Sequence, residues 1–241
     1  MNSFKSQLAI SQANSWQMFN DISQVYDLLN RVLSLGLDTG WRRKLNLFIS
    51  SSRPLSVLDI ATGTADVLIG LVNENQNIER AYGIDLADKM LLKGQHKIDR
   101  LGLSQRIKLK NGDAQQVPFP DHHFDVVTMA FGIRNIENPI TALKEMHRIL
   151  KKEGRVLILE FSLPHNPFLK FFYLIYLRIL VPFFGGLLSG HYQAYYYLNR
   201  TIERFPHGEN FCRLMKQVGF KNTKTYPLTF GIATIYQGDK T

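Results

Sequence analysis

The stretch Val57-Leu58-Asp59-Ile60-Ala61-Thr62-Gly63-Thr64-Ala65-Asp66 decides the fold of this chain. Its first four residues are mostly apolar or β-branched, which suits a buried parallel strand, and the small residues after them let the chain turn sharply. The apolar run 67–72 then predicts a helix capped by Thr64 or Asp66, whose positive end favours an electron-rich group nearby. The stretch therefore predicts half of a βαβ unit with a ligand at its turn.

A second predicted strand, Tyr82-Gly83-Ile84-Asp85, ends in an acid. An acid about 20 residues beyond a glycine turn is placed to accept hydrogen bonds from both hydroxyls of a ribose. The turn lacks the full G-x-G-x-x-G spacing, because Ala61 and Ala65 stand where a dinucleotide fold more usually has glycines. A cofactor with one nucleoside is therefore favoured over NAD. A plain turn at Gly63, with solvated carboxylates at Asp59 and Asp85, is the alternative for either half alone.

Length, charge and cysteine content bound the class of protein. The chain has 241 residues, 45% of them hydrophobic, which is enough for one α/β domain with a small appendage. Its single cysteine, Cys212, excludes an intrachain disulfide, and no secretory signal is evident at the start, so we expect a cytoplasmic protein. The net charge of +9 favours anionic surfaces, but the basic residues are scattered without interleaved aromatics, so specific nucleic-acid binding is not expected.

Strand-like and helix-like segments alternate through the middle of the chain, which predicts a doubly wound, mostly parallel sheet. The expected strands are 56–60, 80–84, 106–110, 124–129 and 155–161, and the expected helices are 67–73, 87–100 and 139–150. Asn138-Pro139 predicts a capped start for the last of these helices, and Lys151-Lys152-Glu153-Gly154 predicts its end. A helix over 208–218 and two β-rich runs, 221–228 and 230–237, predict an antiparallel hairpin at the sheet edge.

Two further segments predict helices outside the sheet. Apolar positions recur at helical spacing over 16–35 and 39–49, and we expect these helices to lie over the site. Residues 168–188 are nearly long and apolar enough to cross a bilayer, but Lys170, Arg178 and the breaks at 182–186 argue against a simple transmembrane helix. Two interpretations remain for this segment. It is either an ordinary buried helix or an aromatic lid that contacts an apolar ligand or the lipid interface.

Several motifs together resemble those of one known family. They are Val57 to Asp66, Gly112-Asp113-Ala114, Phe131-Gly132-Ile133-Arg134-Asn135, Leu159-Glu160-Phe161-Ser162 and, near the start, Tyr26-Asp27-Leu28-Leu29-Asn30. The chain resembles the ubiquinone/menaquinone biosynthesis C-methyltransferases over almost its whole length. The first motif is shared by class I S-adenosylmethionine-dependent methyltransferases in general, whereas the third and fourth are more particular to the quinone methylases.

The resemblance implies one Rossmann-like class I methyltransferase domain over 1–241, with a seven-stranded sheet, N-terminal lid helices in 1–52 and an inserted aromatic lid in 165–205. It implies that S-adenosylmethionine methylates a ring carbon of a prenylated quinol, namely demethylmenaquinol, the benzoquinol precursor of ubiquinone, or both. Peripheral contact with the anionic inner face of a membrane would suit that substrate. A methyltransferase for another hydrophobic acceptor, an NAD-dependent dehydrogenase and a non-catalytic subunit of a quinone-synthesis complex are the alternatives. No pattern predicts an oligomeric state.

Carried over residue by residue, the resemblance also implies a cofactor site. It assigns Thr64, beside Gly63 in the glycine turn, to the methionine part of the cofactor, Asp85 to the ribose, and Asp113 with Ala114 to the adenine. These roles suit the chemistry, because carboxylates accept hydrogen bonds from hydroxyl and amino groups and are favourable near a sulfonium cation. A plain turn role is the alternative for Asp113. No metal is implied.

Methylation of a quinol carbon needs a cation that stabilises the phenolate and a group that receives a proton. Arg134 is the candidate cation, acting as an electrostatic clamp because a guanidinium stays protonated, and a structural ion pair is its alternative role. Glu160, His165 and His191 are the candidates for the proton acceptor, and the sequence does not choose among them. Tyr26 is expected either to pack in the lid or to touch the ring.

Overall fold

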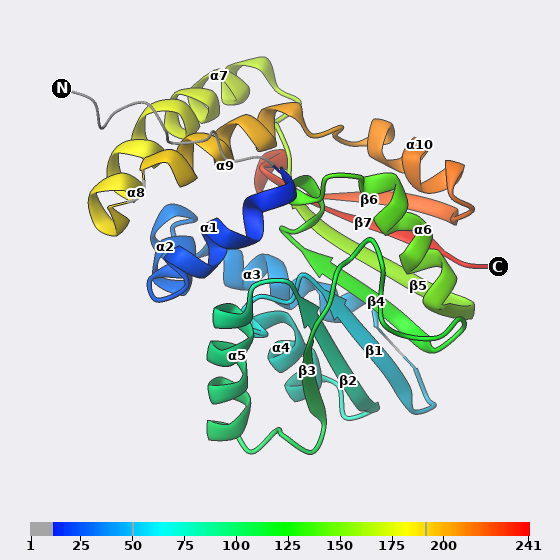
Figure 1. Cartoon of the computed structure of the whole chain (residues 1–241). Coiled ribbons are helices and arrows are strands. Elements are labelled where there is room, and N and C mark those ends of the chain that lie inside the picture. The colour runs from blue at the N-terminus through cyan, green and yellow to red at the C-terminus, as the bar shows by residue number, and fades with distance from the viewer. Residues whose placement is uncertain (1–11, 50, 191) are drawn as a thin grey trace.

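The computed structural model describes residues 12–241 except 50 and 191, and its centre is a seven-stranded sheet of order β3-β2-β1-β4-β5-β7-β6 (Figure 1). The first five strands run parallel, and β7 pairs antiparallel with both β5 and β6. The doubly wound sheet and the antiparallel C-terminal hairpin are therefore confirmed. The strands are β1 Leu55–Ile60, β2 Ile78–Asp85, β3 Ile107–Asn111, β4 Phe124–Ala130, β5 Leu150–Phe161, β6 Lys221–Leu228 and β7 Ala233–Asp239.

Helices cover both faces of the sheet, because successive side chains of a strand point to opposite faces. Val57 of β1 belongs to the apolar core that contains Leu68 of α4, whereas its neighbour Leu58 belongs to the core that contains Met146 of α6. With both faces buried in this way, the carboxyl ends of the strands are left to form a site. The helices of the sheet faces are α4 Asp66–Glu74, α5 Asp88–Arg100, α6 Pro139–Ile149 and α10 Glu209–Gln217.

The start of α4 differs from the prediction, since neither Thr64 nor Asp66 caps it. The N-cap residue is Ala65, in the left-handed conformation at φ 64°, and no side chain caps the helix. The hydroxyl of Thr64 is instead bonded to Asp27 and Lys97, and Asp66 lies inside the first turn. The sequence could not reveal this, because both partners of Thr64 are remote in the chain.

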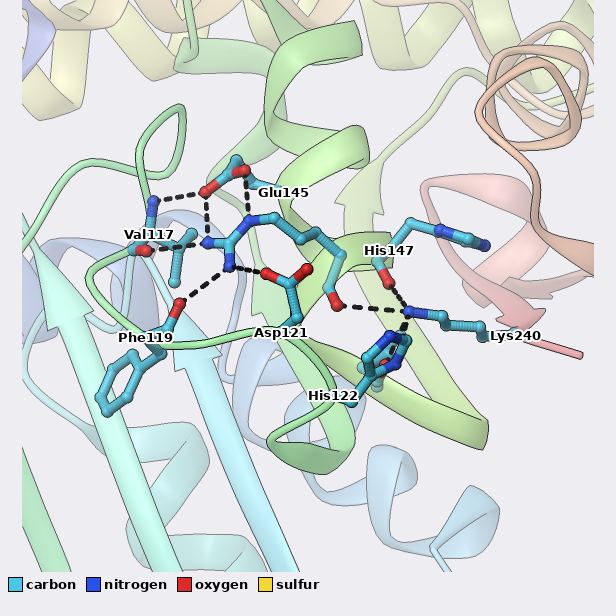
Figure 2. Close-up of polar contacts among 9 residues, drawn as sticks. Val117, Phe119, Asp121, His122, Glu145, His147 and Lys240 are labelled. Atoms are coloured by element: carbon cyan, nitrogen blue, oxygen red, sulfur yellow. Dashed lines mark hydrogen bonds and ion pairs between the residues drawn. The ribbon is translucent and has the colours of Figure 1, made fainter.

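Helix α6 begins as predicted and ends differently. The side chain of Asn138 accepts the backbone N–H of Thr141, with Pro139 in the first turn, whereas β5 starts directly after the helix and includes the residues predicted to terminate it. Besides Arg148 in its last turn, a remote cation lies at its carboxyl end: the ammonium of Lys240 donates to the carbonyl oxygens of His147 (2.6 Å) and Leu150 (2.8 Å) (Figure 2). A cation in this place favours the helix dipole and ties the end of the chain to α6.

The remaining helices gather on one side of the molecule and form a lid (Figure 1). The predicted helix over 16–35 is two helices, because the chain turns at Ser23, whose hydroxyl donates to the carbonyl of Asn20 and competes with helical bonding. The lid helices are α1 Ser15–Ile22, α2 Tyr26–Leu33, α3 Leu37–Arg43, α7 Pro167–Ile175, a π-helical turn Tyr176–Leu180, α8 Val181–Ser189 and α9 Tyr192–Arg204. Short 3-10 turns are Gln12–Asn14, Lys44–Phe48, Ile133–Asn135 and Thr229–Gly231.

The aromatic segment is one long helix, Pro167–Leu187, that is long and apolar enough to cross a membrane by length and composition alone. Tyr173, Leu177 and Val181 on one face are buried in an apolar cluster with Leu29 of α2. The other face is exposed, so that only 22% of the most apolar window is buried. The interpretation as an ordinary buried helix is therefore wrong, and the segment lies over the site as part of the lid.

Candidate functional site

A cavity of about 330 Å³ lies where the carboxyl ends of β1, β2 and β4 meet the lid. Four of the five predicted cofactor residues line it, namely Gly63, Asp85, Asp113 and Ala114. The lid contributes further aromatic side chains for which the sequence predicts no role, among them Phe19 of α1. Helical periodicity could place Phe19 on α1 but could not say which way that face points.

Asp85 is held at the end of β2 by the backbone. Its Oδ2 accepts the N–H of Gly63 at 2.8 Å, and its Oδ1 accepts the N–H of Ala87 at 2.9 Å. Burial raises the pKa of Asp85, and the two N–H groups oppose the rise by favouring the carboxylate. Each oxygen retains a lone pair, so the carboxylate can still accept two hydroxyl groups of a ligand.

Asp113 and Ala114 follow β3, the strand that pairs with β2, and they line the same cavity as Asp85. The Oδ1 of Asp113 accepts the backbone N–H of Gln115 at 2.8 Å, so the residue does organise a turn. It also lines the cavity, so the turn role and a ligand role are compatible. Leu86 and Met90 line the same cavity and add apolar surface of the kind that a planar base needs.

The side chain of Thr64 does not line this cavity. It is 3% exposed, donates to Asp27 Oδ1 at 2.8 Å and accepts from Lys97 Nζ at 2.9 Å. The expected contact between the Thr64 side chain and the methionine part of the cofactor is therefore not supported by its orientation. The hydroxyl serves the attachment of α2 instead.

Asp59 is not the solvated strand-end carboxylate of the simpler interpretation. It is 1% exposed and accepts the hydroxyl of Thr128 at 2.6 Å. Desolvation by burial raises the pKa of Asp59 to about 7, so part of the population is protonated at neutral pH.

A second cavity, of about 370 Å³, lies under the lid and is almost entirely apolar. Leu29 and Leu33 of α2 and Tyr173 and Leu177 of the aromatic helix line it, together with Phe161 at the end of β5. The two cavities adjoin, because Phe19, Tyr26, Phe131 and Asn135 line both of them. Tyr26 therefore forms part of the boundary between a polar and an apolar chamber.

Arg134 and Glu160 form a buried ion pair beside the apolar cavity. Arg134 Nη1 donates to Glu160 Oε1 at 2.6 Å and to the carbonyl of Phe131 at 2.7 Å. Glu160 also accepts the backbone N–H groups of Phe161 and Arg134, at 2.8 and 3.3 Å. Burial raises the pKa of Glu160, and the charge of Arg134 opposes the rise. The ion-pair alternative for Arg134 is thus observed, yet Arg134 also lines the cavity and Glu160 does not.

This arrangement bears on the choice of a proton acceptor. Glu160 is fully buried, accepts three hydrogen bonds from Arg134 and Phe161, and does not line the chamber, so it orients Arg134. His165 is exposed and is not part of the cavity wall, and His191 lies outside the described residues. None of the three candidates is thus placed by the described residues to take a proton from a ligand in the apolar cavity.

Some residues that line the apolar cavity carry unpaired polar atoms. Among the described residues, Arg134 Nε, Asn135 Oδ1 and the Tyr197 hydroxyl are buried without a hydrogen-bond partner, and all three residues line the cavity. Asn135 belongs to a motif quoted above but was given no role, and Tyr197 of α9 was not found from the sequence. Buried polar groups without partners are costly, so this part of the cavity wall suits a ligand that carries oxygen atoms.

The chain is similar to known proteins over nearly its full length. A family model described as the ubiE/COQ5 methyltransferase family matches residues 8–240. The chain is 41% identical to a demethylmenaquinone methyltransferase of Bacteroides fragilis, with 93% of this chain and 91% of the relative covered. It is 42% identical to a ubiquinone/menaquinone biosynthesis C-methyltransferase UbiE of Geotalea uraniireducens, with 93% and 95% covered.

Solved structures are similar at lower identity. A SAM-dependent methyltransferase of Thermotoga maritima superposes with a TM-score of 0.66 at 19% identity, covering 94% of this chain and all of the other. A phosphoethanolamine N-methyltransferase 2 of Haemonchus contortus, in complex with S-adenosylmethionine, gives 0.60 at 16% identity over 81% of this chain and 51% of the other. At these identities the likeness establishes the class I methyltransferase fold.

Proposed function

Because this chain belongs to the ubiE/COQ5 methyltransferase family and is an S-adenosylmethionine-dependent methyltransferase, we propose that it methylates a ring carbon of a prenylated quinol in quinone biosynthesis. The observation that carries the proposal is the pair of adjoining chambers, one polar at the strand ends and one apolar under the lid. A quinol with a long tail needs the second chamber, and a nucleoside cofactor needs the first.

The residues around the polar chamber fit S-adenosylmethionine. The carboxylate of Asp85 can accept both ribose hydroxyls, and the apolar side chains of Leu86 and Met90 offer contact for the adenine. Gly132 and Ala61 both line the chamber, and glycine at 132 lets the turns after β4 and β1 approach closely, since a Cβ there would lie 2.8 Å from the Cβ of Ala61. When bound, the cofactor supplies a methyl group on a positively charged sulfur.

The apolar chamber suits the prenyl tail, because each buried CH₂ contributes roughly 0.8 kcal/mol to binding. Leu35 and Phe230 line this chamber and are also 82% and 80% exposed, so they mark its mouth. Arg134, Asn135 and Tyr197, with their unpaired atoms, are polar residues of its wall. We therefore orient the substrate with its ring beside Arg134 and its tail toward Leu35.

In this orientation Arg134 is proposed to hold the phenolate oxygen of the activated ring. Its guanidinium is fixed by Glu160 and by the ring of Phe161, whose centroid is 5.2 Å from the guanidinium carbon. A fixed cation in a mostly apolar chamber stabilises the negative charge that makes the ring carbon nucleophilic. The only acid among the described residues that line the apolar chamber, Asp38, is paired with Arg42 and Ser34, so we propose that protons leave through water.

We further propose that the enzyme is cytoplasmic and binds the surface of an anionic membrane from that side. The exposed face of the aromatic helix carries Phe168, Phe171, Ile179 and Phe183, and the chain has a net charge of +9. Apolar side chains that enter the interface and basic groups that attract anionic headgroups act together in such contacts. The substrate would then reach the chamber without crossing bulk water.

One experiment tests the reaction directly. The purified protein is incubated with methyl-labelled S-adenosylmethionine and with demethylated naphthoquinol and benzoquinol, each bearing a prenyl tail, and the labelled lipid is analysed. We expect a new methyl group on a ring carbon of at least one quinol. Label on another hydrophobic acceptor alone would favour a different substrate class, and cofactor binding without turnover would favour the non-catalytic subunit.

A further inference from the structure

The lid helix α2 is attached to the cofactor turn by a compact polar cluster. Asp27 of α2 accepts the hydroxyl of Thr64 at 2.8 Å and pairs with Lys97 at 2.8 Å and Lys93 at 3.3 Å. Lys97 also contacts Thr64 Oγ1 at 2.9 Å and pairs with Asp66 at 2.6 Å. We call these five residues the Asp27 latch.

The latch is partly buried, which makes its interactions stronger than those of a surface pair. The side chains of Lys97 and Asp27 are 19% and 28% exposed. Burial raises the pKa of the Asp27 carboxyl, but the bonds from Lys97 and Thr64 outweigh burial and leave the pKa below its ordinary value. Lys93 also donates to the carbonyls of Ser23 and Gln24, so α5 holds the whole turn between α1 and α2.

The residue before Asp27 is Tyr26, which forms part of the boundary between the two chambers. The following turns of α2 supply Leu29, Asn30 and Leu33 to the wall of the apolar chamber. Thr64 lies beside Gly63, which lines the polar chamber. The latch therefore joins α2, which forms part of the wall of the apolar chamber, to the glycine turn of the polar chamber, where the two chambers adjoin.

We propose that Asp27 is a positioning residue which, through Thr64 and Lys97, fixes α2 and Tyr26 against the cofactor turn and so sets the distance between methyl donor and acceptor. This inference rests on the proposed function for the identity of the acceptor. In-line methyl transfer depends steeply on that distance, because a displacement near 1 Å can cost roughly 100-fold in rate. The latch has no need to touch either ligand to have this effect.

The test compares variants of the latch with a carboxylate removed elsewhere. Asp27→Ala removes the whole attachment, Thr64→Val removes only the hydroxyl, and Thr64→Ser restores the hydroxyl. Glu74→Gln is the matched control, because Glu74 of α4 forms an ion pair with Arg43 of the lid helix α3 at 2.7 Å but lies outside the latch. Three quantities are measured for each variant. Calorimetry gives the affinity for the methyl donor, and steady-state kinetics give kcat and KM for the quinol. Hydrogen exchange is followed over residues 15–33.

We expect Asp27→Ala to lower kcat/KM for the quinol roughly 10- to 100-fold, with donor affinity changed less than about threefold and faster exchange over 15–33. Thr64→Val should also lower kcat/KM and speed exchange over 15–33. Thr64→Ser and Glu74→Gln should have kcat/KM and exchange rates near those of the parent. An unchanged kcat/KM in Asp27→Ala, or an equal loss in Glu74→Gln, overturns the proposal.

The exchange measurement separates the two proposals. If the parent protein methylates no quinol, the proposed function fails, but residues 15–33 should still exchange faster in the latch variants. If Asp27→Ala does not fold, Thr64→Val decides the same question, because it removes one hydroxyl and leaves both ion pairs of Asp27 in place. Unchanged exchange over 15–33 in Thr64→Val then overturns the latch.

Discussion

Two arginines outside the sheet, Arg148 of α6 and Arg134 of the 3-10 turn after β4, show how a structural cation differs from one that we propose acts on the substrate. Arg148 of α6 directs five hydrogen bonds to Glu145, Asp121 and the carbonyls of Phe119 and Val117 (Figure 2). Its side chain is 30% exposed, whereas that of Arg134 is 6% exposed.

The two guanidinium groups also differ in how far their donors are used. Arg134 directs Nη1 to Glu160 and to Phe131, and its Nε has no partner among the described residues. A buried donor without a protein partner costs free energy that a ligand or an ordered water can recover. The satisfied arginine therefore marks structure, and the unsatisfied one marks the site.

Replacing Arg134 gives the largest expected effect. Arg134→Gln should lower kcat with the quinol by roughly 100- to 1000-fold, which is the usual effect of removing one group that stabilises a developing oxyanion. Donor affinity should stay near that of the parent, because Arg134 does not line the polar chamber. Steady-state kinetics and calorimetry measure the two quantities.

Arg148→Gln is the matched control for this prediction. It should leave kcat unchanged and lower the free energy of unfolding by roughly 1–3 kcal/mol, because polar groups lose their partners. Since Arg134→Gln leaves Glu160 buried without a cation, Arg134→Lys is measured as well. If Arg148→Gln reduced kcat as much as Arg134→Gln, the distinction between the two arginines would be lost.

The sequence predicted the sheet because apolar strands and amphipathic helices alternate over 56–161, and each segment carries its own periodicity. It also marked the motifs that contain Arg134 and Glu160, but it did not pair them. That pairing follows from β4 and β5 being neighbours, so that the residues after one strand meet the end of the other. The contact of Thr64 with Asp27 could not be predicted, because it depends on where the lid docks.

Two carboxylates of the polar chamber, Asp85 and Asp113, can also be compared, because each can accept further hydrogen bonds from a ligand. Asp85→Ala should weaken S-adenosylmethionine binding by roughly 10- to 100-fold, because hydrogen bonds to a charged group contribute about 1.5–3 kcal/mol. Asp113→Ala should weaken it less, since Asp113 is expected to accept one hydrogen bond from the adenine, whereas Asp85 is expected to accept two from the ribose. Calorimetric titration of both variants measures the difference. Equal losses would show that the sugar is not the main anchor.

Two carboxyl groups, Asp59 of β1 and Glu145 beside Arg148, should make the free energy of unfolding depend on pH with opposite signs. The pKa of Asp59 is raised to about 7, so the folded state holds a proton that the unfolded state releases. Proton binding therefore stabilises the folded state at low pH, and this contribution to the free energy of unfolding is lost as pH rises toward 7. Hydrogen bonding from Arg148 lowers the pKa of Glu145 despite burial, so that stability is lost as pH falls.

Denaturant unfolding at several pH values tests this sign. In the parent, the titration of Asp59 should lower the free energy of unfolding by on the order of 2 kcal/mol between pH 5 and pH 8, since one pKa unit corresponds to about 1.4 kcal/mol. Asp59→Asn should not show this decrease. The difference between parent and variant is the quantity to plot, because other groups titrate in both. A difference that stays flat between about pH 5 and pH 8 would mean that Asp59 is ionised throughout, and would contradict the prediction.

The aromatic helix offers the same contrast for apolar groups, with Tyr173 and Leu177 satisfied by packing and Phe171 and Phe183 about 60% exposed. Phe171→Asp with Phe183→Asp should reduce binding to vesicles that contain anionic lipid by roughly tenfold, since each removes part of an apolar contact worth about 1 kcal/mol or more. Leu92→Asp with Leu101→Asp introduces the same charge at exposed positions on and beside α5, outside the lid. Because that control changes the net charge equally, a loss confined to the phenylalanine pair assigns the contact to the helix face, and an equal loss in both assigns it to charge alone.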